Sequence, residues 1–392
     1  MKRRTFIATA GLSALSASCL PRTAFAATAS KPYKACVIGD TQHGGYGHSL
    51  HLLWKLRDDV ELVALADPYE KGREKYGRES GAGRLYADYG KMLEKEKPDF
   101  VAVGPRWTIN HREYLLACAA VGAHGILEKP LTPDLACGDE AIAALDAKNL
   151  RWSIAFNFRA SPEIAHAKHL IFEEGLLGEI LEVRARGKED RRAGGEDLIV
   201  LGIHLFDMMR YFMDDPVWCM AYISEQGNAA TLDDAREATE PLGPIIGDSV
   251  HAVWGFKSGI NGRFVSVKHS DIYPQQWGLD IQGSKGIATI RMGPIPSVQY
   301  AETPDWASDD VQWKPLPGRP VIEKRSPEQV AHYAPIIDDL VAAVEEDRRP
   351  LVSIHDGLAA TEMIQSVFES HLKGCRVLMP LKNREHPLQK NG

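Results

Sequence analysis

Between residues 34 and 155, short apolar runs alternate with longer segments of helical periodicity. The apolar runs are residues 35–38, 60–66, 100–103, 125–127 and 152–155. Helical patterns stand between them, at residues 47–56, 70–79, 110–120 and 134–147. Parallel strands need a crossover connection, and a helix usually supplies it. The alternation therefore predicts an α/β fold that begins with a parallel, doubly wound sheet.

After residue 155 the apolar pattern changes to a period of two. It is seen at residues 180–186, 251–256, 263–269, 277–282 and 287–291, with helical segments at 197–212, 333–346 and 355–372. A period of two buries one face of each strand, as in antiparallel sheets. For a chain of 392 residues we expect two domains, residues 31–155 and residues 156–392, the second built on a mostly antiparallel sheet.

The first thirty residues form a segment of a different kind. Arg3 and Arg4 precede an apolar run at residues 7–20, and an A-x-A pattern ends at Ala26. This combination predicts a cleaved twin-arginine signal and an exported, periplasmic protein, with an amphipathic N-terminal helix as the alternative. The apolar run is too short to span a membrane. Ser16 stands where a lipoprotein box usually has leucine, so lipid anchoring is not expected.

The net charge and the arrangement of cysteines and histidines argue against a nucleic-acid-binding protein, a disulfide-rich protein and a metalloprotein. A net charge of −7 offers no basic face for a nucleic acid. The cysteines form no C-x-x-C pair, so neither a disulfide framework nor a zinc ribbon is indicated. His43, His48 and His51 are near one another in sequence, but no carboxylate or cysteine completes a usual ligand set. No metal site is therefore expected.

A glycine-rich loop follows the first apolar run and contains four glycines: Gly39, Gly44, Gly45 and Gly47. Glycines between a strand and a helix let the backbone approach a pyrophosphate, which then lies on the helix N-terminus. Asp67 ends the next strand, where a carboxylate hydrogen-bonds the ribose 2′-hydroxyl and repels a 2′-phosphate. The pattern favours NAD over NADP, against the alternative of a plain turn and a helix-capping aspartate.

Two further segments carry groups that can move protons. Lys129, beside Glu128, follows a strand whose end faces the predicted cofactor crevice; a surface ion pair is the alternative. His204 lies in an apolar helix with Asp207 one turn later on the same side. A histidine with a carboxylate neighbour can serve as a general base for a hydroxyl proton, and a buried core histidine is the alternative.

The loop at residues 187–192 stands between a predicted strand and the helix of His204. Lys188, Asp190 and Arg191 could bind sugar hydroxyls, and Arg191 or Arg192 a carboxylate. A solvated loop is the alternative.

Together these features resemble the glucose-fructose oxidoreductase and inositol dehydrogenase family, often called Gfo/Idh/MocA, over nearly the whole mature chain. The matching positions beyond the glycine-rich loop are Asp67, Pro105 with His111, Glu128-Lys129-Pro130, Asn157 with Arg159, and Gly202, His204 and Asp207.

The resemblance implies a Rossmann domain followed by an α/β domain with a large open sheet, through which members often form dimers or tetramers. It implies that Lys129 and His204 face the nicotinamide. Further residues would lie at the cofactor: Pro105, His111 and Glu128. Others would lie at the substrate near the domain junction: Asn157 and Arg159.

Two departures from the family pattern stand out. Many dehydrogenases of the family have an aspartate four residues before the histidine, where this chain has Val200, which cannot complete a proton relay. The glycine-rich loop carries extra residues, 40–43, and Asp40 would repel a phosphate if it pointed inward.

The predicted function is NAD-dependent oxidation of a sugar, glycoside or polyol. Hydride would pass to the nicotinamide while Lys129 and His204 handle the proton and the oxyanion. One alternative is a nicotinamide-dependent glycosidase or lyase that oxidises its substrate transiently. The other is a sugar-binding protein without catalysis.

Overall fold

The computed structural model of the chain describes residues 32–269, 276–293, 295–307, 309, 311–322 and 324–389. The predicted signal segment, residues 1–30, lies outside the described residues. Within the described ranges no helix has the length and apolar character needed to cross a membrane.

Six parallel strands form the first sheet, in the order β3-β2-β1-β4-β5-β6. The strands are β1 Tyr33–Ile38, β2 Val60–Ala66, β3 Arg84–Tyr86, β4 Phe100–Val103, β5 His124–Leu127 and β6 Trp152–Ile154. The helices around them are α1 Glu70–Ser80, α2 Tyr89–Glu96, α3 His111–Val121 and α4 Leu135–Asp146. The prediction of a parallel, doubly wound sheet is confirmed. Its strand order reverses between β1 and β4, which leaves a crevice at their carboxyl ends.

Ten strands form the second sheet, in the order β17-β16-β15-β14-β7-β13-β12-β8-β18, with β9 beside β8. Only β7 and β13 pair in parallel among the described neighbours, so the prediction of a mostly antiparallel sheet is confirmed. The strands are β7 Ile180–Arg186, β8 Pro216–Glu225, β9 Asn228–Ala229, β12 Ser249–Phe256, β13 Asn261–Val267, β14 Gly278–Gly283, β15 Ile287–Arg291, β16 Ser297–Ala301, β17 Lys314–Pro315 and β18 Val377–Leu378. A small hairpin pairs β10 Arg236–Glu237 with β11 Pro244–Ile245.

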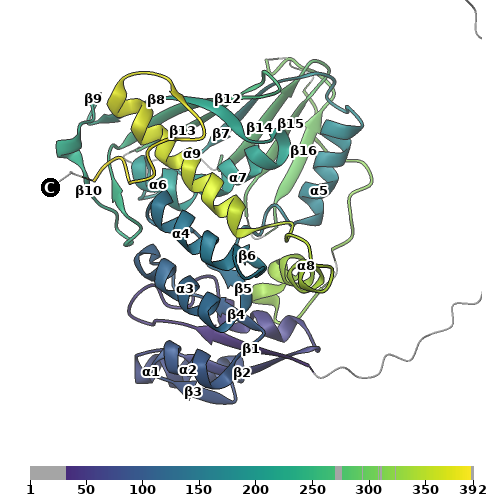
Figure 1. The fold of residues 1–392 in the computed structure, drawn as a ribbon. Helices are drawn as coiled ribbons and strands as arrows, with labels where there is room; N and C mark the ends of the chain where they lie inside the picture. The colour runs from purple at the N-terminus through teal and green to yellow at the C-terminus, as the bar shows by residue number, and fades with distance from the viewer. Residues whose placement is uncertain are drawn as a thin grey trace, which may run out of the picture. The chain divides into compact units, whose positions relative to one another are not determined.

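Helices cover one face of the large sheet (Figure 1). They include α5 Pro162–Lys168, α6 Gly195–Val200, α7 Gly202–Met213 and α9 Ile354–Lys373, while α8 Ala334–Glu345 packs near β6. Helix α9 begins with a capping box formed by Ser353 and Asp356 and ends at Gly374, whose φ is +62°. It contacts β8 and α7 on one side and α4 and β6 on the other, so it joins the layers of the two sheets.

Two expected helices differ in the structure. Instead of a helix over residues 47–56, the glycine-rich loop continues to Ser49, at φ +67°, and only a 3-10 turn, η1 Leu50–Leu56, follows. The expected helix at residues 197–212 is interrupted at Leu201, where φ is −120°, and forms α6 and α7. Both interruptions lie at the candidate site, and both leave backbone groups free for other partners.

Candidate functional site

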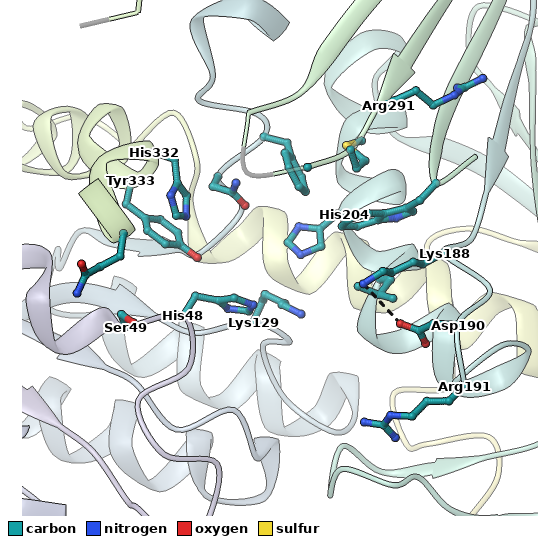
Figure 2. Close-up of a pocket in the computed structure, with 17 residues that line it drawn as sticks. His48, Ser49, Lys129, Lys188, Asp190, Arg191, His204, Arg291, His332 and Tyr333 are labelled. Carbon is teal, nitrogen blue, oxygen red and sulfur yellow. Dashed lines mark ion pairs between the residues drawn. The ribbon is translucent and has the colours of Figure 1, made fainter. Parts of the chain in front are cut away.

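A cavity of about 900 Å³ opens beside the carboxyl end of β5. Its walls come from the glycine-rich loop, the chain after β5 and β6, the loop before α6, helix α7, the ends of β14 and β15, and the 3-10 turn η5 Glu328–Tyr333. Figure 2 shows Lys129, His204 and Tyr333 pointing into this hollow from different elements. The structure thus brings together Lys129, Asn157, Lys188, Asp190, Arg191 and His204, which the sequence singled out.

Lys129 is held at the cavity wall by a backbone oxygen. Its Nζ donates a hydrogen bond of 2.9 Å to the carbonyl of Val200, the last residue of α6. The helix interruption at Leu201 lets the neighbouring turn present this oxygen to the lysine. Burial lowers the pKa of Lys129, although Glu128 beside it acts in the opposite direction.

Glu128 lies behind Lys129 and is completely buried. Its carboxylate accepts a hydrogen bond from the backbone N–H of His48 at 3.0 Å, and the His48 ring Nδ1 lies 3.0 Å from both oxygens. Burial by itself raises the pKa of Glu128, but His48 and Lys129 outweigh it and lower the pKa to about 2. Glu128 is therefore an ionised anchor that fixes His48 at the cavity mouth.

His204 projects from α7 among aromatic rings. The centroids of Phe158, Phe156 and Trp277 lie 5.0, 5.7 and 6.3 Å from its ring. Burial, with Lys129 and His48 adding to it, lowers the pKa of His204 well below 6.5. Its Nδ1 is buried and has no hydrogen-bond partner within the described part of the chain. The imidazole is thus neutral near pH 7 and competent to accept a proton.

Asp207 and Arg159 lie in a buried ionic network, which differs from the roles expected for them. The Arg159 guanidinium contacts the Asp207 carboxylate at 2.5 Å and the Asp356 carboxylate at 3.2 Å, and Arg210 contacts Asp356 at 3.1 Å. Asp207 therefore pairs with Arg159 rather than with His204. One turn of helix places two side chains on the same side, but a guanidinium satisfies a buried carboxylate better than a neutral ring does.

The loop before α6 is organised from behind by Asp197. This buried carboxylate accepts hydrogen bonds from the Ser266 hydroxyl at 2.6 Å and from the backbone N–H groups of Glu189 and Lys188 at 3.0 and 3.3 Å. These bonds turn Lys188 toward the cavity, where its Nζ lies 3.5 Å from Asp190. Asp197 therefore shapes the loop and cannot replace the missing relay aspartate at position 200.

The other charged side chains of this loop, Asp190, Arg191 and Arg192, form ion pairs and hydrogen bonds with nearby residues. Asp190 also pairs with Arg192 at 2.6 Å; burial raises the pKa of Asp190, and Arg192 outweighs it to hold the pKa at about 2. Arg191 donates to the Thr239 hydroxyl at 3.1 Å. Two lysines and two arginines (Lys129, Lys188, Arg191 and Arg291) therefore line the cavity, and Asp190 is the one carboxylate among the described residues that line it.

Sequence reasoning missed the wall formed by η5 and the large sheet. Gln329, His332 and Tyr333 line the cavity from η5, and Trp277 and Arg291 line it from the sheet. Burial raises the pKa of Tyr333 well above 10, so the phenol keeps its proton and can donate a hydrogen bond. In the sequence, the only sign of this wall is a group of aromatic and polar side chains at residues 329–333. Many helices that line no cavity have the same composition.

The glycine-rich loop folds back on itself as a short hairpin. Asp40 and Gly45 exchange two backbone hydrogen bonds of 3.2 and 2.7 Å, and the Asp40 carboxylate accepts from the backbone N–H groups of Gln42 and His43. Asp40 is thus turned into its own loop rather than toward a phosphate. Gly44, at φ +96°, packs against the backbone of Arg106 and Trp107, where a Cβ would collide.

Asp67, expected to hold a ribose, is wholly buried and bonded within the protein. Its Oδ2 accepts from the Tyr46 hydroxyl at 2.9 Å, from the Thr41 N–H at 3.2 Å and from the Thr41 hydroxyl. Its Oδ1 accepts from the Tyr69 N–H at 2.9 Å. The Tyr46 ring covers Gly39, leaving no room there for a Cβ. Both Gly39 and Asp67 therefore contact side chains of the glycine-rich loop.

His111 joins the two loops that follow β4 and β5. Its Nε2 lies 2.7 Å from the Pro105 carbonyl, and its Nδ1 lies 2.9 Å from the Leu131 carbonyl. The ring is completely buried, so His111 and Pro105 support the crevice from within.

The described residues nevertheless fit a dinucleotide at this crevice. Gly45, at φ +66°, has no described atom within 4 Å of the place a Cβ would occupy, so its backbone is open to a phosphate. His48 and Ser49, which follow the same loop, line the cavity together with Lys129 and His204, and His204 keeps an unbonded ring nitrogen. Among the described residues no group of three or more His, Cys, Asp or Glu side chains could hold a metal ion.

Family models match most of the chain. Residues 34–156 match the NAD-binding Rossmann fold of the Gfo/Idh/MocA oxidoreductase family, and residues 173–379 match its C-terminal alpha/beta domain. The chain belongs to this family. It is therefore an oxidoreductase of an NAD-dependent family whose named relatives are dehydrogenases of sugars and inositols.

Three of the similar proteins are named as dehydrogenases of D-apiose, levoglucosan and myo-inositol. D-Apiose dehydrogenase from Paraburkholderia graminis is 25% identical over 92% of this chain and 93% of its own length. Levoglucosan dehydrogenase from Pseudarthrobacter phenanthrenivorans is 28% identical over 50% of this chain, and the match spans 56% of that relative. Myo-inositol 2-dehydrogenase from Thermotoga maritima is 26% identical over 59% of this chain and 68% of its own length.

Solved structures share the fold at lower identity. A levoglucosan dehydrogenase in complex with NADH and levoglucosan superposes with a TM-score of 0.70 at 21% identity, covering 89% of this chain and 100% of that one. An oxidoreductase from Agrobacterium radiobacter with NAD+, L-tartaric acid and magnesium gives 0.66 at 18% identity, covering 88% and 98%.

Proposed function

We propose that the protein oxidises one hydroxyl-bearing carbon of a sugar, glycoside or polyol, with His204 as the proton acceptor and Lys129 as the group that holds the reacting oxygen. The observation that carries the proposal is the shared cavity. Lys129, fixed by the Val200 carbonyl, and the neutral His204 both face one hollow at the carboxyl end of β5. Bound NAD would accept the hydride from the substrate carbon.

His204 suits the role of base because it is neutral and is not committed to a carboxylate. Its lowered pKa keeps it unprotonated near pH 7, so it can take a hydroxyl proton as the carbon is oxidised. Lys129 lies across the cavity, where its N–H groups can donate to the same oxygen and stabilise the charge that develops on it.

The lining of the cavity supports a polyhydroxylated substrate. Trp277 and Phe158 offer apolar faces, while Asn157, Lys188 and Asp190 offer hydrogen-bonding groups. Pockets for small molecules commonly combine apolar walls with a few polar groups that fix orientation. The compounds after which the relatives are named, D-apiose, levoglucosan and myo-inositol, carry several hydroxyl groups, and we propose the same class of substrate here.

Purified protein, NAD and a panel of aldoses, methyl glycosides and inositols would test the function. Formation of NADH with one class of compound, and its loss by at least about a hundredfold in His204→Ala, is the expected result. Leu232→Ala, at an exposed position outside the cavity, is the control. Full turnover by both His204→Ala and Lys129→Ala would remove the assigned roles.

One observation favours elimination from a glycoside as a second candidate. The partner of Lys129 is a backbone carbonyl, which cannot pass a proton onward to solvent as a carboxylate could. Transient oxidation that returns its hydride needs no such exit. Release of an aglycone without net NADH would identify this chemistry, and ligand binding without either product would identify a binding protein.

We further propose that the chain is exported through the twin-arginine route and assembles as a homodimer or homotetramer. Arg3→Lys with Arg4→Lys should leave the protein in the cytoplasmic fraction. For assembly, Met220, Tyr222 and Val253 are exposed on neighbouring strands of the large sheet, where paired chains would bury them. Light scattering after size exclusion would measure the mass, and a monomer would contradict the assembly.

A further inference from the structure

A second cavity adjoins the one that Lys129 and His204 line. It has a volume of about 240 Å³ and lies between the first turns of α5 and α8, the residues before β16 and the segment that leads into η5. Asn157 and His332 line both cavities, and Figure 2 shows His332 beside Tyr333 at the edge of the first. Because the two cavities share these side chains, one ligand that contacts both residues can extend from the first cavity into the second.

The walls of the second cavity are mainly apolar. Its charged groups pair with each other or with a neighbour, since Asp338 lies 2.7 Å from Arg325 and 3.0 Å from Arg57. No tryptophan, tyrosine or phenylalanine is among the described residues that line it, so it offers no flat ring for a second sugar. The apolar wall includes Pro162, Ile295, Pro296, Val321, Ile322 and Pro335. Apolar walls with neutralised charges favour an apolar group as the occupant.

Three of these wall residues expose apolar surface to solvent. Val321 is 96% exposed, Ile295 54% and Ile322 38%. Single exposed apolar side chains are common in proteins, whereas a group of them around one hollow is typical of a binding site. An apolar ligand in the second cavity would remove part of this surface from water.

Asn157, on the wall common to both cavities, has hydrogen-bonding capacity to spare. It is 9% exposed, and its side-chain amide makes no hydrogen bond to another described residue. A buried amide without a partner is unfavourable, so such groups usually bind a ligand or water. A ligand oxygen at the junction of the two cavities would accept a hydrogen bond from this amide.

We propose that the second cavity binds the apolar aglycone of a glycoside whose sugar ring lies beside Lys129 and His204. Asn157 then donates to an oxygen at the junction of sugar and aglycone. The inference rests on the proposed function and narrows it, because the substrate is an alkyl or aryl glycoside rather than a free monosaccharide or an inositol. An apolar cavity of about 150 Å³ binds benzene, so the second cavity is large enough for an aromatic ring.

Calorimetric titration of His204→Ala in the presence of NAD would measure binding with little turnover. The probes are the methyl and phenyl glycosides of glucose and galactose, in both anomers, with cellobiose and lactose as glycosides of polar aglycone. For one sugar, the phenyl glycoside should bind about tenfold more tightly than the methyl glycoside, as expected if roughly 55 Å² of additional apolar surface is buried. The disaccharide should gain less than about threefold over the methyl glycoside.

Ile295→Ser in the same background should reduce the phenyl-to-methyl affinity ratio to less than about threefold, because a hydroxyl replaces part of the apolar wall. Asn157→Ala should weaken both glycosides by about tenfold. Leu181→Ser is the matched control for Ile295→Ser. Leu181 is 51% exposed on β7 and lies outside both cavities, so the ratio should keep its value.

The unmodified protein, assayed for NADH and for released phenol, separates this inference from the proposed function. Turnover combined with equal affinity for phenyl and methyl glycosides, or with a disaccharide that binds more tightly than the phenyl glycoside, would overturn the inference alone. A lower mass of Ile295→Ser in light scattering, with an unchanged affinity ratio, would assign the exposed residues to contact between chains and also overturn it. A phenyl preference that Ile295→Ser removes, without NADH or phenol, would support the aglycone site and overturn the proposed function.

Discussion

Replacing Glu128 with glutamine should lower the free energy of unfolding, and the shift in the pKa of Glu128 gives the approximate size of the loss. The carboxylate is buried, and its pKa is lowered from 4.5 to about 2 by His48 and Lys129 despite the opposing effect of burial. That difference corresponds to about 3 kcal/mol in favour of the ionised form in the folded protein. Because the folded pKa lies below the unfolded one, this stability is complete above pH 4.5 and is lost as the pH falls toward 2.

Urea unfolding of Glu128→Gln and of the unmodified protein between about pH 7 and pH 3 would measure the effect. We expect a loss of about 2 to 3 kcal/mol at neutral pH that shrinks as the solution becomes more acidic. Glu94→Gln, on an exposed position of α2, should change stability by less than about 0.5 kcal/mol. A Glu128→Gln difference as small as this control, or one that does not vary with pH, would refute the reasoning.

Three further outcomes follow from the site. His204→Ala should lower kcat by about a hundredfold or more in steady-state assays, because a neutral base is removed. The pH profile of kcat/KM should stay flat from about pH 7 to about pH 6, because burial lowers the pKa of His204 well below 6.5; a midpoint near 6.5 would contradict this. Arg159→Met should cost about 3 to 5 kcal/mol in urea unfolding by leaving Asp207 buried without its partner, and Asp207→Asn added to it should recover part of that loss.

Periodicity was enough to predict the two sheets because it is a local property of the chain. Strand β4 and the last four residues of β1 are apolar and buried, while β13 alternates, as a sheet with one covered face requires. The two misjudged helices show the limit. Residues 47–56 have helical spacing, but Ser49 takes a left-handed conformation and His48 donates its N–H to Glu128, a residue eighty positions away.

The candidate site was predicted where function depends on residue type and missed where it depends on competition between partners. Lys129 and His204 lie in the cavity as the sequence indicated. Asp207 has the expected spacing from His204, yet its carboxylate forms an ion pair with Arg159, which belongs to another segment of the chain. Spacing along one helix predicts which side chains are near each other. Which of them form an ion pair depends also on the charged side chains that other elements bring into contact with them. Asp67 illustrates the same point. Its hydrogen-bond donor Tyr46 lies in the glycine-rich loop, 21 positions earlier in the chain, and no local spacing relates the two residues.

The replacement of a relay aspartate by Val200 changes which proton movements the site can support. A carboxylate beside Lys129 could take up a proton from it, whereas the Val200 carbonyl, at 2.9 Å, can only accept a hydrogen bond. Lys129 is thereby fixed in position without gaining a route to solvent. In the proposed mechanism, the proton taken from the substrate would remain on His204 until it exchanges with solvent or until the hydride returns. A reaction that returns this proton to the substrate within one turnover needs no route to solvent. Net oxidation would instead require His204 to release the proton to solvent, past His48 and Ser49 at the cavity wall.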